Sequence, residues 1–413
     1  MLMAPRTIKR GPADPDPARL RPILERAMRM PALSDKYAAA RSSRTVPTLR
    51  DLPVLTREDV NKAIDHLLRR DPGRLEGTLL NVTGGTMSEP RLGIVPEDMF
   101  LTEIRTRWNP LDTGDLLISL FSPGHMWSAH YFHNALGRRS GASTIPFETP
   151  DDAELGRCLD FYEGLGATAL AATPDAIRRI LRFCASTGRR LPWLHKLLWA
   201  GTGFDDATAE LLSRQFPHVQ AWGLYGSAET WMIGHIGPEC ARNTFHVLPH
   251  QHVEIDNGRL LLTTLHDDSV VPLIRYDIGV AGSWGTCTCG RTDRAIRVSQ
   301  RTDSLFELLN QLVSPDDLVE LALQLETVRE AEVVLMEPGT ENARMHLRVR
   351  VEPGVDADPY TCEWIRHHVV TGSFGLARML EKEPELFEVV AVGRLREYTL
   401  GPEETPALTA ERA

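Results

Sequence analysis

Lysine is scarce in this chain of 413 residues: of its 46 basic residues, only Lys9, Lys36, Lys62, Lys196 and Lys382 are lysines, and the others are arginines. Cysteine is also scarce, with six residues, and the N-terminal stretch shows no apolar segment that would indicate a secretory signal. A disulfide framework is therefore not expected. Because no run approaches the roughly 20 apolar residues that cross a bilayer, we expect no membrane span and a cytoplasmic location.

The charge balance excludes a second class of function. Acidic residues outnumber basic ones by 56 to 46, which gives a net charge of −10. Nucleic acid is a poor default partner for such a chain, because phosphate binding needs a basic surface.

The length exceeds the roughly 250–300 residues at which a single core stops growing, so the sequence predicts two domains.

The sequence pattern changes twice along the chain. After about 50 residues with patches of helical pattern, short apolar strands alternate with helical stretches between residues 78 and 245, which is typical of α/β units around a largely parallel sheet. Residues 245–300 then read as β-strands only. We expect an N-terminal domain over 1–300 and a small α+β domain over 301–413, with a disordered tail at 401–413.

Two loops at predicted strand ends carry residues suited to nucleotide binding. Thr83–Pro90 (TGGTMSEP) follows an apolar strand and offers backbone N–H groups and hydroxyls that can wrap phosphates, although such loops are also plain turns. It is not a Walker loop, since it has no Gly-Lys-Ser/Thr. The second segment, Trp222–Glu229 (WGLYGSAE), combines a stacking ring, two glycines and a carboxylate that can bind Mg²⁺; the alternative is a strand, a turn and a surface acid.

Two further groups are ambiguous from the residues alone. Cys240, His246, Cys287 and Cys289 supply three thiolates and an imidazole, the donor set of a structural zinc site, but their spacing matches no common zinc finger. The alternative is four unrelated reduced side chains. The charged residues of Pro272–Gly279 (PLIRYDIG) either bind a ligand or close a strand edge.

Taken in order, these segments resemble the phenylacetate–CoA ligase-like branch of the adenylate-forming (acyl-AMP) superfamily over nearly the whole chain. LRDLPVLTREDV is similar to the entry motif of the branch, and Thr83–Pro90 falls where the family has its phosphate loop. YGSAE is similar to the family's YG.(T/S)E, PLIRYDIG to P.IRY.t.D, and CTCGRTDRAIRVSQRTD to the passage that leads to the interdomain hinge. The joint order of these motifs is more specific than any one of them.

The resemblance implies a fold and a site. It implies a large N-terminal adenylate-forming domain with mixed and parallel sheets and a small mobile C-terminal α+β domain, with the zinc loop at 240–289, the hinge at Asp303 and Mg²⁺ on Glu229. It assigns the nucleotide to Thr83, Gly84, Gly85, Thr86, Ser88, Gly201, Tyr225, Gly226, Ser227, Asp277 and Arg301. It assigns the acid to His125, Trp127, His130, Tyr131, Ala200 and Gly203. The aromatic and histidine side chains in this set suit a flat, aryl-type acid, or are ordinary core and surface residues.

Four positions depart from the family pattern. Glu89 replaces the lysine of the phosphate loop, Ala228 replaces a hydroxyl, and Val280 replaces the aspartate that grips the ribose, which leaves Asp277 as the local carboxylate. The catalytic lysine near the C-terminus is missing, since no lysine follows Lys382. Each lost charge-assisted contact costs about 1.5–3 kcal/mol. We hypothesise that Arg394 or Arg396 supplies the missing cation.

Three hypotheses for function follow from the resemblance. The first is an ATP- and Mg²⁺-dependent, AMP-forming ligase of specialised metabolism that joins an aryl-type carboxylic acid to CoA, a carrier thiol or an amine. The second is the same scaffold with adenylation lost, which acts on or binds a preformed acyl or aryl molecule. The third is a non-catalytic partner of a true ligase. The sequence leaves the acid, the acceptor and the assembly open, a homodimer included.

Overall fold

The computed structural model describes residues 15–41, 47–83, 85–86, 91–122, 128–201, 204, 206–301, 306–308, 311–313, 315–337, 343–393, 395 and 408–411. Contacts divide the chain into two compact units: unit 1 comprises residues 1–81 and 92–300, and unit 2 comprises residues 82–91 and 301–413. Within the described ranges, every helix is too short or too polar to cross a bilayer.

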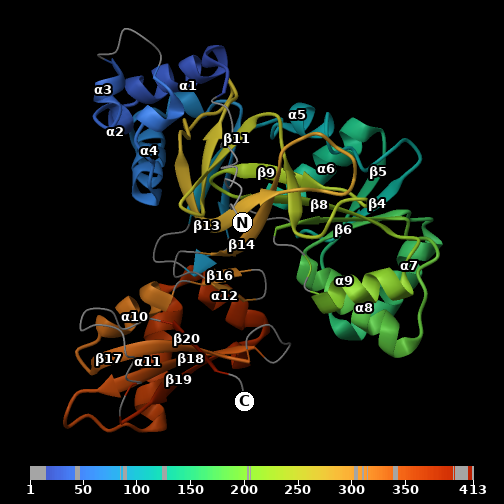
Figure 1. Cartoon of the computed structure of the whole chain (residues 1–413). Coiled ribbons are helices and arrows are strands. Elements are labelled where there is room, and N and C mark those ends of the chain that lie inside the picture. The colour runs from blue at the N-terminus through green and yellow to red at the C-terminus, as the bar shows by residue number, and fades with distance from the viewer. Residues whose placement is uncertain are drawn as a thin grey trace, which may run out of the picture. The chain divides into compact units, whose positions relative to one another are not determined.

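The centre of unit 1 is a sheet of eleven described strands, in the order β11-β12-β13-β14-β10-β9-β8-β7-β6-β4-β5 (Figure 1). One half is parallel and consists of β4 (Leu116–Ser119), β5 (Ser143–Pro146), β6 (Ala169–Ala172), β7 (Lys196–Ala200) and β8 (Gln220–Ser227). The other strands are β9 (Trp231–Ile236), β10 (Thr244–Val247), β11 (Gln251–Asp256), β12 (Arg259–Thr264), β13 (Tyr276–Gly285) and β14 (Ala295–Arg301). The predicted change from α/β to all-β sequence is confirmed.

Alternate residues of the parallel strands enter different cores, because successive side chains of a strand point to opposite faces. Ile118 and Leu170 pack with helices α7 (Asp152–Gly164), α8 (Pro174–Thr187) and α9 (Asp206–Gln215). Their neighbours Leu117 and Ala169 pack with α5 (Leu101–Arg105) and α6 (Ser128–Ser140) on the other face (Figure 1). Both faces are thus covered, which explains why these strands are apolar throughout.

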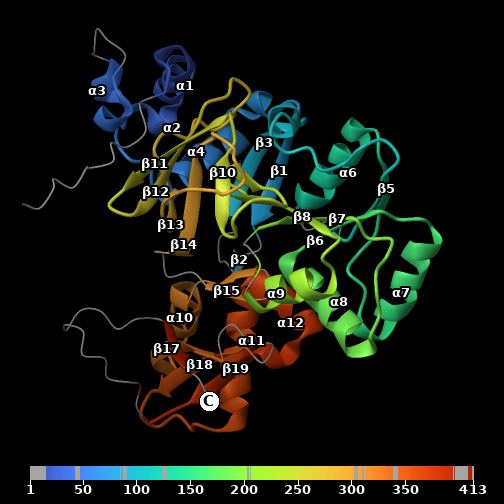
Figure 2. The same cartoon turned by 45° about the vertical axis from the view of Figure 1, so that its right-hand side comes forward.

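The N-terminal helices cover the antiparallel half of the sheet. They are α1 (Pro17–Arg29), α2 (Pro31–Ser34), α3 (Ala38–Arg41) and α4 (Arg57–Arg70), with short 3₁₀ turns at Leu49–Asp51 and Pro72–Leu75. A capping box starts α4: the Thr56 hydroxyl accepts the Asp59 amide, and the Asp59 carboxylate accepts the Thr56 amide. Strands β1 (Thr78–Thr83) and β3 (Arg91–Pro96) form a separate two-stranded ribbon (Figure 2).

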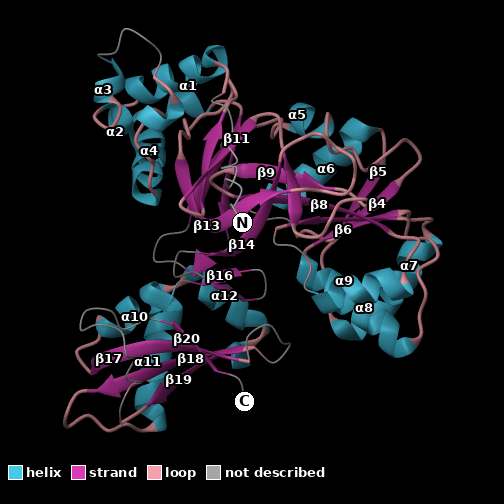
Figure 3. Ribbon diagram, in the orientation of Figure 1, coloured by secondary structure: helices cyan, strands magenta, loops and turns pink. Residues whose placement is uncertain are grey.

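Unit 2 is an α+β unit (Figure 3). Its described strands form the sheets β19-β18-β17-β20 and β15-β16-β2. The strands are β2 (Gly85–Thr86), β15 (Phe306–Leu308), β16 (Gln311–Val313), β17 (Val328–Met336), β18 (Arg344–Val351), β19 (Phe387–Ala391) and β20 (Leu408–Glu411). Its helices are α10 (Pro315–Leu323), α11 (Pro359–Gly372) and α12 (Phe374–Lys382), with a 3₁₀ turn at Pro384–Leu386.

The prediction of a disordered tail is wrong for Leu408–Glu411. This segment pairs in parallel with Val333–Met336 of β17. The polar composition of 401–413 concealed four residues that can occupy an open sheet edge, and pairing at that edge satisfies backbone groups of β17 that would otherwise be exposed.

Candidate functional site

The carboxyl ends of the parallel strands gather several predicted site residues at one edge of the sheet. Ala200 ends β7 and pairs with Leu224 of β8, and the Gly201 amide donates to the Leu224 carbonyl at 3.1 Å. Gly201 has φ +116°, a conformation that favours glycine. The strand pairing therefore brings the predicted acid-pocket end of β7 next to Tyr225.

Tyr225 and the residues after it form a tightly constrained strand end. The Tyr225 ring is 8% exposed and lies 5.1 Å from the Phe245 ring, so that the core fixes one side of it. A Cβ at Gly226 would stand 2.0 Å from the Trp231 carbonyl oxygen, so only glycine fits there. The hydroxyls of Ser227 and Thr230 are 2.9 Å apart and join the two sides of the β8–β9 turn.

Glu229 lies in this turn and faces β13. The Tyr276 hydroxyl donates to Glu229 Oε1 at 3.5 Å, which connects the YGSAE segment to the PLIRYDIG segment. The next residue, Asp277, pairs with Arg259 at 2.7 Å and accepts the Gly279 amide at 3.0 Å. Val280, where the resemblance implies a ribose-binding aspartate, is 4% exposed. Asp277 would thus have to exchange Arg259 for a ribose hydroxyl.

Helix α6 presents its predicted acid-binding residues on two faces. His130 Nδ1 lies 2.7 Å from the carbonyl oxygen of Phe121, which closely follows β4, and His130 Nε2 lies 3.0 Å from Asn134 Nδ2. Tyr131 is 46% exposed on another face. His133 is fully buried and stacks on Phe121 with ring centroids 4.5 Å apart. Burial lowers the pKa of His133 to about 4, so this ring is neutral.

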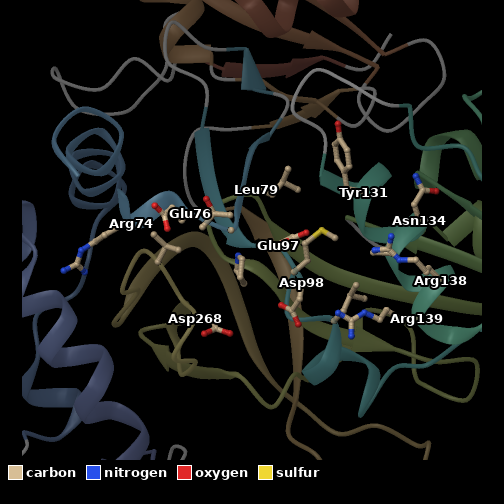
Figure 4. A pocket seen from close by; sticks show the side chains of 17 residues that line it. Arg74, Glu76, Leu79, Glu97, Asp98, Tyr131, Asn134, Arg138, Arg139 and Asp268 are labelled. Atoms are coloured by element: carbon tan, nitrogen blue, oxygen red, sulfur yellow. The ribbon is translucent and has the colours of Figure 1, made fainter. Parts of the chain in front are cut away.

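The exposed face of α6 lines a groove of about 840 Å³ in unit 1 (Figure 4). Tyr131, Arg138 and Arg139 stand on the α6 side, and Glu97 and Asp98 stand between them and the start of β1. Arg138 and Arg139 follow Tyr131 by seven and eight positions, a spacing that puts residues on one face of a helix. The three side chains therefore face the same groove. His130 and Tyr131 therefore lie on different faces of α6, and Asn134, which contacts His130, also lines the groove.

The four predicted metal ligands come together although nearly 50 residues separate the first from the last. Their donor atoms all lie within 4.8 Å of one another, and His246 Nε2 is 3.2 Å from Cys289 Sγ. The Gly237 and Ala241 amides donate to Cys240 Sγ and Cys287 Sγ at 3.3 and 3.2 Å. In a tetrahedral site with Zn–S of about 2.3 Å, ligand atoms lie roughly 3.8 Å apart, so this set fits zinc after a small contraction.

The thiols of this set differ in acidity. Burial raises the pKa of Cys240. At Cys287 burial acts in the same direction, but hydrogen bonds from the backbone N–H groups of Cys289 and Ala241 and from the side chains of His246 and Cys289 together outweigh it and lower the pKa. His246 also connects the set to the YGSAE strand, since Leu224, His235 and His246 form one row across β8, β9 and β10. Strand pairing thus links the set, through β9, to the strand that carries Tyr225.

Some predicted residues lie outside the described part of the chain: Gly84, Ser88, His125, Trp127, Gly203, Asp303, Arg394 and Arg396. For Thr83, Gly85, Thr86 and Arg301, the structure describes the backbone alone, at the end of β1, in β2 and at the end of β14.

Sequence reasoning did not single out three buried polar residues next to these segments. They are Asn81 on β1, His133 on α6 and His235 on β9, all at most 1% exposed. For His235 and Asn81, a polar residue within an apolar strand could have drawn attention. The sequence pattern alone does not tell whether such a side chain is buried or points to solvent.

Comparison with solved structures identifies the fold. At 16% identity, the structure of 2-hydroxyisobutyryl-CoA ligase with 2-HIB-AMP and CoA superposes with a TM-score of 0.76 and covers 96% of this chain and 89% of its own. The chain has the adenylate-forming ligase fold. The amide bond synthetase McbA from Marinactinospora thermotolerans, also 16% identical, gives 0.59 over 80% of this chain and 68% of its own. A malonyl-CoA ligase, 17% identical, gives 0.56 over 77% and 71%. No protein-family model and no curated protein sequence matches the chain.

Proposed function

We propose that this protein activates a carboxylic acid with ATP as an acyl-adenylate and transfers the acyl group to a thiol or an amine, as a member of the phenylacetate–CoA ligase-like branch. The observation that carries the proposal is the convergence of Ala200, Gly201, Tyr225–Ser227 and Glu229 at the carboxyl edge of the parallel sheet, in a fold whose solved examples include CoA ligases and an amide bond synthetase.

In the proposed reaction, a carboxylate oxygen of the acid attacks the α-phosphorus of ATP, and the bond from that phosphorus to the bridging oxygen breaks to release pyrophosphate. The thiol or amine then attacks the acyl carbon, and AMP leaves. Catalysis of such displacements consists largely of positioning and charge neutralisation. Tyr225 would stack on the adenine, Ser227 and Gly201 would contact the nucleotide, and Mg²⁺ on Glu229 would neutralise phosphate charge.

The proposal needs a cation at the α-phosphate, and the lysines whose side chains the structure describes are all engaged in ion pairs. Lys36 pairs with Asp59, Lys62 with Glu58, and Lys196, at the amino end of β7, with Asp112 and Asp115. Lys196 thus lies at the edge of the sheet opposite the candidate site, since β7 runs from Lys196 to Ala200. We therefore propose that an arginine supplies the charge.

Arg394 and Arg396 are the proposed source of this charge, with the hinge at Asp303 and the 301–413 segment as the small domain that delivers it. Arg394→Ala with Arg396→Ala should lower acid-dependent AMP release at least 100-fold, whereas Arg344→Ala, an exposed arginine of β18, should change it less than twofold. Equal activity of the double variant and the control would contradict the role of these arginines.

For the acid, we propose an aryl-type carboxylate held near His130 and entering beside Tyr131. The Cys240–Cys289 set is proposed as a structural zinc site: a closed shell of three thiolates and one imidazole leaves no open position for catalysis, and bound zinc would hold the β9–β10 loop against the β13–β14 hairpin.

One observation favours the alternative in which adenylation is lost. The position of the ribose-binding aspartate is a buried valine, and Asp277 is already paired with Arg259. Calorimetry with ATP and Mg²⁺ separates the two functions: binding with a dissociation constant in the micromolar to millimolar range supports the ligase, and absence of binding to the folded, zinc-loaded protein supports the alternative.

A further inference from the structure

Asn81 is a buried amide without a hydrogen-bonding partner. It lies on β1, two residues before the strand ends at Thr83, and it is 0% exposed. Among the residues that the structure describes, neither Asn81 Nδ2 nor Oδ1 has a partner. Because burying a polar group without a hydrogen bond is unfavourable, buried amides in native proteins are nearly always paired, and an exception calls for an explanation.

The surroundings of Asn81 connect it to the YGSAE segment. A Cβ at Gly93 of β3 would stand 1.9 Å from the Ala228 carbonyl oxygen and 2.7 Å from Asn81 Oδ1. The amide of Asn81 and the carbonyl of Ala228 therefore border the same small space, which exists only because residue 93 has no side chain. Ala228 directly precedes Glu229, the proposed Mg²⁺ ligand, and it offers no side-chain hydroxyl of its own.

We infer that Asn81 is a positioning residue that holds the Ala228–Glu229 turn through the backbone. A half-turn of the carboxamide exchanges its two ends, which brings Nδ2 toward the Ala228 carbonyl, where it donates a hydrogen bond. This bond couples β1, which leads into the proposed phosphate loop, to the turn that carries Glu229. The catalytic consequence rests on the proposed function, whereas the coupling itself does not.

Two substitutions test the donor. Asn81→Asp keeps the shape but replaces the donor with a second acceptor, and Asn81→Leu fills a similar volume without polar atoms. Tyr162→Phe is the matched control, because it removes a fully buried hydroxyl from α7 of the same unit. If Asn81 positions Glu229, both Asn81 variants lower the kcat of acid-dependent AMP release 10- to 100-fold and change the KM for ATP less than threefold, and Tyr162→Phe changes neither.

Hydrogen exchange of the peptide that spans residues 224–231 is a readout that does not require activity. Both Asn81 variants should speed its amide exchange at least tenfold, with the exchange of α7 unchanged. If exchange and kcat stay at wild-type values in Asn81→Leu, the inference is overturned. If the wild type releases no AMP with any acid, the proposed function fails, and the exchange rates alone decide whether Asn81 holds the turn.

Discussion

Gly93→Ala adds one carbon where β3 contacts Asn81 of β1 and the β8–β9 turn that carries Glu229. A Cβ there would stand 1.9 Å from the Ala228 oxygen, 2.5 Å from the Ala228 carbonyl carbon and 2.7 Å from Asn81 Oδ1. Non-bonded heavy atoms pack at about 3.5–4.0 Å, so β3 and the β8–β9 turn would have to separate by roughly 1.5 Å. Two of the three atoms belong to the backbone, so no side-chain rotation relieves the overlap.

The expected cost follows from this displacement. Overpacking of a core costs about 1–3 kcal/mol, which lowers the melting temperature by several degrees in a unit of this size. Displacing a catalytic group by about 1 Å costs about 100-fold in rate. We therefore expect Gly93→Ala to lower acid-dependent AMP release about 100-fold while the protein remains folded at 25 °C.

The assay compares initial rates of AMP release and melting temperatures with those of a matched glycine. Gly164→Ala, at the end of α7, meets open space, and it should preserve the rate and leave the melting temperature unchanged or slightly higher, since alanine favours helix. A Gly93→Ala protein with the wild-type rate and melting temperature would refute the close approach of β3 to the YGSAE turn.

Three further predictions test other parts of the account. Cys289→Ser should lose close to one equivalent of zinc by elemental analysis and melt at a lower temperature, as the wild type should after chelation. Cys362→Ser, outside the set, should keep the zinc content and the melting temperature of the wild type. Equal zinc content in the two variants would contradict the site. Burial lowers the pKa of His133 from 6.5 to about 4 in the folded state, so the unfolded state takes up the proton first as the pH falls. Urea titrations should therefore show the free energy of unfolding falling between pH 6.5 and 4 by up to about 1.4 kcal/mol per pH unit for this histidine. His133→Phe should remove that part of the pH dependence, and an unchanged dependence would show that the ring is not held neutral. Tyr131→Ala should raise the KM for the acid or the acceptor with little change in kcat, and unchanged KM values for both would exclude the groove as their binding route.

The parts of the fold that sequence predicted are those that local pattern determines. Strands β4 to β8 are short apolar runs bounded by turn residues, and helices α7 to α9 have a helical apolar period, so their order already implied a parallel sheet. Parallel pairing then places the ends of β7 and β8 together, so that Ala200 and Tyr225, which the resemblance assigned to the acid and to the nucleotide, lie at one edge of the sheet.

Features that depend on pairing between distant segments were not predictable in this way. Nothing in the residues 82–91 indicates that Gly85 and Thr86 pair with β16 of unit 2, or that Leu408–Glu411 pairs with β17. The burial of Asn81 also depends on β3 and the β8–β9 turn, which meet only in three dimensions. The Cys/His set lies between these cases, because its donor chemistry was visible in the sequence but its convergence was not.

Acid-dependent release of AMP from ATP and Mg²⁺, measured over a panel of aryl and aliphatic acids with hydroxylamine as the trapping acceptor, tests the central claim most directly. The account predicts AMP and a hydroxamate in equal amounts with at least one class of acid, most of all with aryl acids, from zinc-loaded protein. No AMP with any acid from a folded, zinc-loaded preparation would contradict it and would support a scaffold that has lost adenylation.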